Sequence, residues 1–230
     1  MDRKILIDVE EEFDSIFRRC QSETMTSAER AYALYKAVQH VTDAGIDGAF
    51  VECGVWRGGS VMVMAETLTA RGCTDRDIFL YDTFDGMTEP TPVDINIRGH
   101  DACGLLEQTS KGEENNVWAY AGLETVQNNL RRTPYPWDRF HFVRGPVETT
   151  LQEVVPPKIA LLRLDTDWYE STRIELEILY PRLQPGGVII IDDYGHWQGA
   201  RKAVDEYFSR IEKKVLLNRI DYTGRIAVKT

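Results

Sequence analysis

AFVECGVWRGGS, at residues 49–60, has the pattern of a buried strand that runs through a glycine-rich turn into a helix. The strand is apolar apart from Glu52, which is typical of a strand covered on both faces. Gly54 and Gly58 let the backbone approach a ligand closely, and a helix that begins near Ser60 offers unpaired N–H groups. Ligands of open α/β sheets bind beyond the carboxyl ends of the strands. This turn is therefore expected to hold a nucleotide-like cofactor.

The acidic residue at the end of this strand favours one cofactor over another. Glu52 would repel the diphosphate of NAD, but it tolerates a cofactor with a cationic amino-acid portion, such as S-adenosylmethionine. The turn also lacks the G-x-G-x-x-G spacing of dinucleotide-binding folds. The next apolar run ends in Asp82, where a carboxylate can accept hydrogen bonds from the ribose hydroxyls that both cofactors carry. Alternatively, Asp82 only begins the turn that follows it.

Further apolar runs alternate with helical patterns along the rest of the chain. The apolar runs lie at residues 49–53, 78–82, 140–143, 159–164, 188–191, 215–220 and 225–228. The helical patterns lie between them, at residues 60–70, 119–131, 170–183 and 199–212. This alternation predicts a doubly wound α/β fold whose sheet of about seven strands is mostly parallel. The short Asp221–Gly224 link predicts an antiparallel hairpin at the C-terminal edge.

The whole chain, residues 1–230, is predicted to form one domain of ordinary size. Residues 1–45 are expected to be a helical N-terminal extension, in which Thr26 and Glu29 form a capping box. Residues 84–118 contain glycine, proline and asparagine but little periodic apolar signal. Because a loop this long inside a compact domain is usually functional, we expect a lid over the site, the alternative being a plain surface excursion.

Four aspartates follow two of the apolar runs. Asp165 and Asp167 end the fourth run, and Asp192 and Asp193 end the fifth. If those strands are neighbours, four like charges share one crevice, and a divalent cation with oxygen ligands would neutralise them. Asp165, Asp192 and Asp193 can supply three ligands, whereas Asp167 can face the substrate as a general base. The alternative is that these aspartates cap the helices that follow; His196 could also line the site.

The overall composition excludes several partners. The net charge is −10 and the isoelectric point is about 5.0, which disfavours nucleic acid and anionic membranes. The four cysteines lack C-x-x-C spacing, so a structural zinc is not expected. The charged N-terminus does not resemble a signal peptide, and no apolar run approaches the length of a membrane span. We therefore expect a cytoplasmic protein with reduced thiols.

Five motifs together resemble a known family. They are FVECGVWRGGS, LYDTFDGM, LRLDTDWYEST, LQPGGVIIIDDYG and AVDEYF. They resemble the macrocin O-methyltransferase family, which includes the mycinamicin and novobiocin sugar methyltransferases of antibiotic biosynthesis. The resemblance extends roughly from residue 25 to the end, and the combination of DTD with DDY is specific.

The resemblance implies a class I methyltransferase fold, which is Rossmann-like, and a role for each motif. S-adenosylmethionine would bind at the turn and Mg²⁺ at Asp165, Asp192 and Asp193, with Asp167 as general base and Asp82 on the ribose. The other residues expected to hold the cofactor are Glu52, Gly54, Trp56, Gly58 and Ser60. The acceptor would be a hydroxyl of a sugar or glycoside, and the assembly a dimer or larger homo-oligomer.

Three other functions are compatible with parts of this pattern. A catechol-type O-methyltransferase would use a similar metal arrangement on an aromatic diol. A cofactor-binding protein without catalysis would need no Mg²⁺. An NAD-dependent dehydrogenase would share Asp82, but Glu52 and the glycine spacing count against it.

Overall fold

The computed structural model, which describes residues 9–112 and 117–230, contains a seven-stranded sheet with strand order β3-β2-β1-β4-β5-β7-β6. The strands are β1 (Ala49–Cys53), β2 (Ile78–Asp82), β3 (Phe140–Arg144), β4 (Ile159–Leu164), β5 (Leu183–Ile191), β6 (Asn218–Arg219) and β7 (Arg225–Val228). Strands β1 to β5 are parallel, and β7 pairs antiparallel with both β5 and β6. The predicted doubly wound sheet with a C-terminal hairpin is confirmed.

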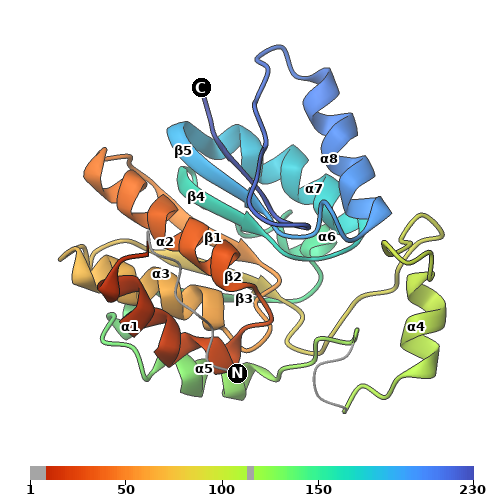
Figure 1. Ribbon diagram of the computed structural model, residues 1–230, viewed down its shortest axis with the longest axis horizontal. Coiled ribbons are helices and arrows are strands. Elements are labelled where there is room, and N and C mark those ends of the chain that lie inside the picture. The colour runs from red at the N-terminus through yellow and green to blue at the C-terminus, as the bar shows by residue number, and fades with distance from the viewer. Residues whose placement is uncertain (1–8, 113–116) are drawn as a thin grey trace.

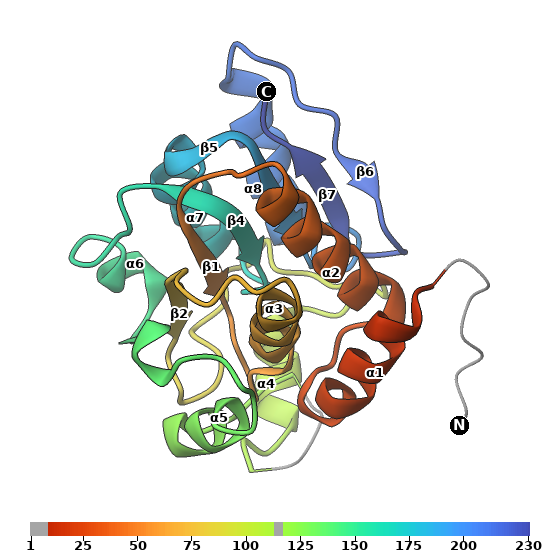
Figure 2. The same ribbon diagram turned by 90° about the vertical axis from the view of Figure 1, so that its left-hand side faces the viewer.

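Helices cover both faces of the sheet (Figure 1). One face packs against α1 (Glu11–Cys20), α2 (Ala28–Asp43), α3 (Gly59–Ala70) and α5 (Leu123–Leu130). The other packs against α6 (Val147–Thr150), α7 (Tyr169–Leu179) and α8 (Gln198–Arg210). Short 3₁₀ turns are η1 (Gln21–Glu23), η2 (Trp137–Arg139) and η3 (Tyr180–Arg182). In Figure 2, α2 and α3 lie on one side of the sheet, and α7 and α8 lie on the other. None of the helices in the described part of the chain combines the length and apolar character that a bilayer crossing requires.

The alternation of side chains along the strands places charged groups on one face. Glu52 in β1 is the register partner of Arg163 in β4, which is the partner of Ile190 in β5. Successive residues of a strand point to opposite faces. Asp165 and Asp192, each two residues further along, therefore lie on the same face as Arg163, the face that α2 covers.

The start of α2 differs from the expected capping box. The N-cap is Ser27, whose Oγ accepts a hydrogen bond from the Arg30 N–H at 3.1 Å. Thr26 lies one residue before the cap, and its hydroxyl donates to Asp192 at 3.4 Å. The capping prediction was therefore wrong by one residue, because Thr26 has a partner in the site.

Three element boundaries also differ from the sequence patterns. The helix expected at 119–131 begins at Leu123, and the strand expected at 215–220 is reduced to Asn218–Arg219. The strand expected at 188–191 already begins at Leu183 and includes the Pro-Gly-Gly sequence, and its register with β4 shifts between Ile159 and Leu161. None of these differences moves a strand tip at the site.

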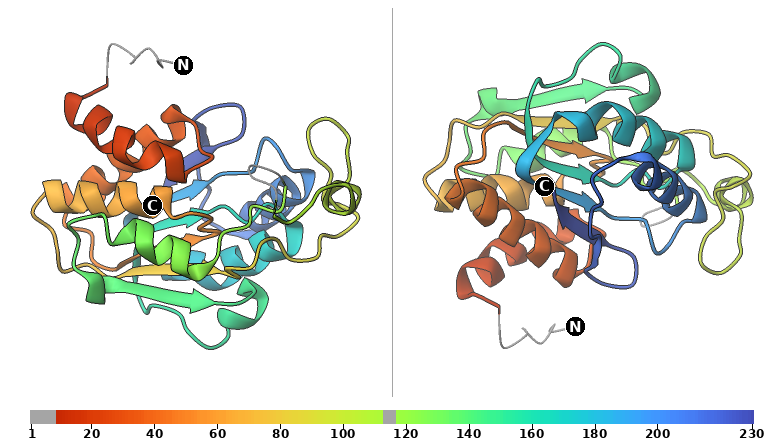
Figure 3. Two further views of the ribbon diagram at one scale, coloured as in Figure 1. Left: turned by 90° about the horizontal axis from the view of Figure 1, so that it is seen from below. Right: turned by 90° about the horizontal axis from the view of Figure 1, so that it is seen from above.

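Residues 84–112 project from one end of the molecule around α4 (Ala102–Gln108), as Figure 3 shows. Residues 113–116, which belong to the expected lid, lie outside the described residues. The fully buried Asp94 fastens the segment, since its carboxylate accepts hydrogen bonds from the Thr91 N–H and from the Tyr169 N–H at the start of α7. The Trp168 indole donates to the Thr88 carbonyl at 3.1 Å. The segment is thus tied to the elements that carry the aspartates.

Candidate functional site

A cavity of about 640 Å³ opens at the carboxyl ends of β1, β2, β4 and β5. Its size lies in the range of small-molecule sites. All the predicted site residues except Gly58 line it. The strand order reverses between β1 and β4, so the cavity lies at the switch point of the sheet.

The glycine-rich turn is shaped by the strand beside it. Gly54 has φ 79°, and a Cβ added there would lie 1.9 Å from the Asp165 carbonyl oxygen. This glycine therefore permits the tips of β1 and β4 to approach one another. Gly58 has φ 88° and precedes α3 without a side-chain cap, which leaves N–H groups of the first turn available. Trp56 and Ser60 line the cavity on either side of Gly58 in the sequence.

Asp82 holds the turn from the neighbouring strand. Its Oδ2 accepts hydrogen bonds from the N–H groups of Val55 at 2.7 Å and Trp56 at 3.2 Å. Its Oδ1 accepts from Phe84 at 2.6 Å. Burial raises the pKa of Asp82, and these backbone hydrogen bonds oppose the rise. Since each carboxylate oxygen has two lone pairs, Asp82 can organise the turn and still face a ligand.

Arg163 joins three of the acidic side chains. Its side chain is 3% exposed and forms ion pairs with Glu52, with Asp165 at 2.7 Å and with Asp192 at 2.7 Å. Burial raises the pKa of Glu52 to about 7, against the effect of the guanidinium. The second carboxylate oxygen of Glu52, Oε2, is buried and has no hydrogen-bond partner among the described residues. Glu52 is one of the residues that line the cavity beside the turn.

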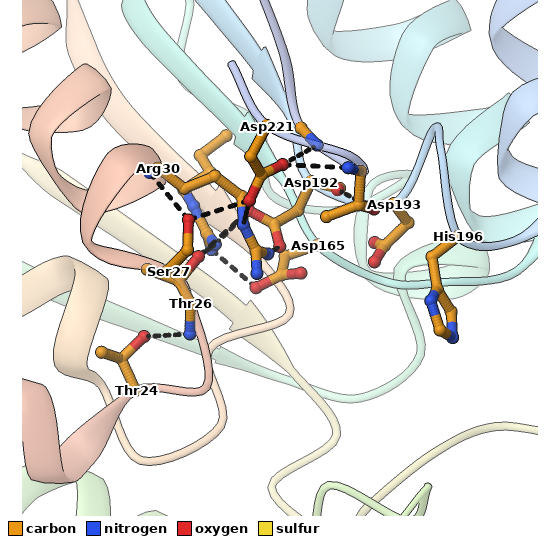
Figure 4. Close-up of polar contacts among 12 residues, drawn as sticks. Thr24, Thr26, Ser27, Arg30, Asp165, Asp192, Asp193, His196 and Asp221 are labelled. Carbon is orange, nitrogen blue, oxygen red and sulfur yellow. Dashed lines mark hydrogen bonds and ion pairs between the residues drawn. The ribbon is translucent and has the colours of Figure 1, made fainter. Parts of the chain in front are cut away.

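A second arginine reaches the site from α2. The Arg30 guanidinium pairs with Asp192 Oδ2 and, through Nε, with Asp221 Oδ2 at 3.0 Å. Figure 4 shows Ser27, which precedes α2, and Arg30, which lies on it, beside Asp192 and Asp221, with His196 beyond Asp193. Two guanidinium groups therefore lie among the aspartates, so a metal ion would not be their sole counter-charge.

The arginines leave an excess of negative charge. Asp165, Asp192 and Asp193 each offer a carboxylate oxygen, and the three oxygens lie within 4.8 Å of one another. Asp193 forms no ion pair within the described part of the chain. Burial raises the pKa of Asp165 and Asp193 well above the usual range, and the neighbouring carboxylates add to it. Three close carboxylate oxygens suit a hard divalent cation.

Asp167 turns into the same crevice through an unusual backbone conformation. Its φ is 65°, and its N–H donates to Asp193 Oδ2 at 3.2 Å. Burial raises the pKa of its carboxyl to about 7, and hydrogen bonds from Asp193 and Trp197 partly counter this. Of the non-glycine residues described with positive φ, Trp56, Ala119 and Asp167 line the cavity. Such strain commonly concentrates at functional sites.

Residues from the lid segment and from the C-terminal hairpin complete the cavity. Asn96 and Arg98 come from residues 84–118, and Tyr222 comes from the link between β6 and β7. The His196 Nδ1 lies 3.2 Å from the Tyr222 hydroxyl oxygen. Burial lowers the pKa of His196, and Arg98 and Arg30 contribute to the lowering. Sequence reasoning predicts a place in the site for His196 but misses Asn96, Arg98 and Tyr222, because loop residues carry no periodic signal.

Arg163 and Arg30 are the other residues that sequence reasoning missed. A signal for Arg163 was present, since a charged residue inside an otherwise apolar strand is rarely buried without a partner. Arg30 stands in the first turn of a helix, where the helix dipole disfavours a cation. A buried charge in an apolar strand and a cation in the first helical turn are both unfavourable unless an acidic side chain lies nearby. Both positions could therefore have indicated an acidic partner.

Comparisons with known proteins agree on one family. The family model described as Macrocin-O-methyltransferase (TylF) matches residues 13–228. The chain is 38% identical to the 8-demethyl-8-(2,3-dimethoxy-alpha-L-rhamnosyl)-tetracenomycin-C 4'-O-methyltransferase of Streptomyces olivaceus over 87% of the chain and 73% of that protein. It is 31% identical to the demethyldecarbamoylnovobiocin O-methyltransferase of Streptomyces niveus, with the same coverage of each chain.

A solved structure matches as well. The O-methyltransferase NovP superimposes with a TM-score of 0.78 at 30% identity, over 90% of this chain and 82% of that one. The region matched by the family model includes the glycine-rich turn, Asp82 and all four aspartates.

Proposed function

Because the chain belongs to the macrocin O-methyltransferase family, we propose that it methylates a sugar hydroxyl of a glycosylated natural product with the help of Mg²⁺. The chain is an S-adenosylmethionine-dependent O-methyltransferase of the class I fold. This excludes the cofactor-binding protein without catalysis and the NAD-dependent dehydrogenase. One observation carries the proposal: a single cavity contains the glycine-rich turn, the three clustered carboxylates and Asp167.

The cofactor is proposed to bind between the turn and Asp82. The partnerless Glu52 Oε2 suits the cationic ammonium of the amino-acid portion. The one lone pair that the backbone leaves free, on Asp82 Oδ1, suits a ribose hydroxyl. Trp56 and Ser60 line the same part of the cavity, and the first turn of α3 offers N–H groups beyond Gly58. These features support S-adenosylmethionine at this end.

The metal is proposed to bind Asp165, Asp192 and Asp193. The donor set fits a magnesium ion, because all three ligands are carboxylate oxygens drawn from two adjacent strand tips. When bound, the cation would stabilise negative charge that develops on the acceptor oxygen. Arg163 would hold Asp165 and Asp192 in place from behind, since it bonds to both.

Asp167 is proposed to accept the proton of the acceptor hydroxyl. Its raised pKa, about 7, is matched to proton transfer near neutral pH. The loss of this proton to Asp167 prepares the oxygen to attack the sulfonium methyl group, and S-adenosylhomocysteine leaves. Asn96, Arg98 and His196, at the end of the cavity that the lid segment reaches, offer polar groups for a sugar.

A comparison of acceptors tests this function. Purified protein would be incubated with S-adenosylmethionine and either rhamnosides or simple catechols, with Mg²⁺ or with EDTA. We expect methylated glycosides, detected by mass spectrometry, only in the presence of Mg²⁺. Methylation of catechols alone would make the enzyme a catechol-type methyltransferase. Equal turnover of glycosides in EDTA would remove the metal from the proposal.

A further inference from the structure

Asp192 differs from the other two proposed metal ligands. Both of its carboxylate oxygens already bond to arginine, Oδ1 to Arg163 and Oδ2 to Arg30. In Asp165, one carboxylate oxygen pairs with an arginine. In Asp193, neither oxygen pairs with an arginine of the described residues. A dication bonded to Asp192 would therefore lie close to a guanidinium group, and the two like charges repel strongly in a poorly solvated site.

Of the two arginines, Arg30 is the one that can move away from Asp192. Arg163 is almost completely buried and bonds to three carboxylates, so its displacement would leave several buried charges unpaired. The Arg30 side chain is 12% exposed and has a second anchor, because its Nε bonds to Asp221. The stem of Arg30 also packs against the hairpin, where a Cβ at Gly224 would lie 2.9 Å from its Cδ.

We propose that Arg30 is an internal competitor of Mg²⁺ for Asp192, occupying Oδ2 in the metal-free protein and retreating onto Asp221 when the metal binds. This inference rests on the proposed metal site. Ser27 also donates to Asp221, at 2.8 Å, so the hairpin carboxylate remains fastened to α2 in either state. Arg30 thus holds Asp192 in position before the metal arrives, at the cost of weaker metal affinity.

Calorimetric titration with Mg²⁺, without cofactor or acceptor, tests the competition. We expect Arg30→Gln to bind Mg²⁺ more tightly than the wild type, by roughly tenfold, because the competing charge is gone. Arg30→Lys keeps the charge and should restore most of the weaker affinity. Arg98→Gln removes one charge from the same cavity, and it should leave the affinity near that of the wild type, because the ion pairs of Asp165 and Asp192 in the described residues are with Arg163 and Arg30.

Unchanged or weaker affinity in Arg30→Gln, with wild-type binding of S-adenosylmethionine as evidence of folding, would overturn the inference alone. The absence of Mg²⁺ binding in both proteins would overturn the metal part of the proposed function together with it. If Arg30→Gln does not fold, NMR of arginine Nε–H groups in the wild type gives the answer. We expect the Arg30 signal to shift with Mg²⁺ more than that of Arg163, and a stationary Arg30 signal contradicts the competition.

Discussion

Arg163 determines how the acidic side chains can coexist at the end of the sheet. It lies on a strand whose neighbours in both directions supply its partners, Glu52 from β1 and Asp192 beyond β5. The sequence placed the carboxylates at the strand tips correctly. It could not predict their pairing with Arg163, because that depends on the register of three strands that are far apart in the chain.

Replacing Arg163 tests its role as the buried counter-ion. Arg163→Met removes the partner of three carboxylates, and we expect the free energy of unfolding in EDTA to fall by about 3–5 kcal/mol. Arg71→Met is the control, since Arg71 pairs with Asp43 near the surface and such pairs contribute about 1 kcal/mol or less. Urea denaturation measures both. Equal losses in the two variants would show that the buried network does not stabilise the fold.

Asp167 gives the second prediction at this scale. Asp167→Asn keeps the shape of the side chain, and asparagine tolerates the positive φ of this position. We expect kcat to fall about a hundredfold or more, because the amide cannot accept the proton. Binding of S-adenosylmethionine, measured by calorimetry, should stay the same. Turnover like that of the wild type would assign the general base to another residue.

The sequence predicts the strands and helices that carry the site better than it predicts the residues at which the helices begin. The strand tips followed from apolar runs that end in aspartate, and parallel β4 and β5 bring Asp165 close to Asp192. The predicted N-cap of α2 was wrong. Thr26 satisfies the capping pattern locally, but its hydroxyl donates a hydrogen bond to Asp192, which is far away in the sequence. A tertiary partner of this kind leaves no periodic signal.

The turn between β1 and α3 depends on a glycine for packing against β4. Gly54→Ala would place a Cβ 1.9 Å from the Asp165 carbonyl oxygen. We therefore expect loss of measurable S-adenosylmethionine binding and a large fall in melting temperature. Gly72→Ala is the matched control: Gly72 also has positive φ, 69°, but no atom lies within 4 Å of its Cβ position.

This control separates backbone strain from the steric clash. Gly72→Ala should cost about 1 kcal/mol of stability, as expected for a left-handed alanine, with cofactor affinity unchanged. If Gly54→Ala behaves like Gly72→Ala, the approach of β1 to β4 is not required for cofactor binding. Thermal unfolding and calorimetric titration with the cofactor measure the two effects.

The molecule as a whole concentrates buried acid around the carboxyl ends of its strands. One face carries Glu52, Asp165 and Asp192, and the α7 side of the sheet carries the fully buried Glu175. The Glu175 Oε2 accepts a hydrogen bond from the Thr166 hydroxyl at 3.1 Å, while its Oε1 has no partner among the described residues. Burial raises the pKa of Glu175 well above its usual range.

This buried acid predicts a protein that, without metal, loses stability as the pH rises. The folded state keeps a proton on Glu175 that the unfolded chain releases above about pH 4.5, so the free energy of unfolding falls by up to about 1.4 kcal/mol per pH unit. Glu52 contributes in the same direction up to its pKa of about 7.

Glu175→Gln removes one titrating group, so the fall in the free energy of unfolding between pH 5 and 7, measured by urea denaturation in EDTA, should be smaller than in the wild type. The lowered pKa of His196 gives an opposite slope below pH 6.5, but it is common to both proteins and cancels in the comparison. Parallel curves for the two proteins would mean that Glu175 is charged in the folded state despite its burial.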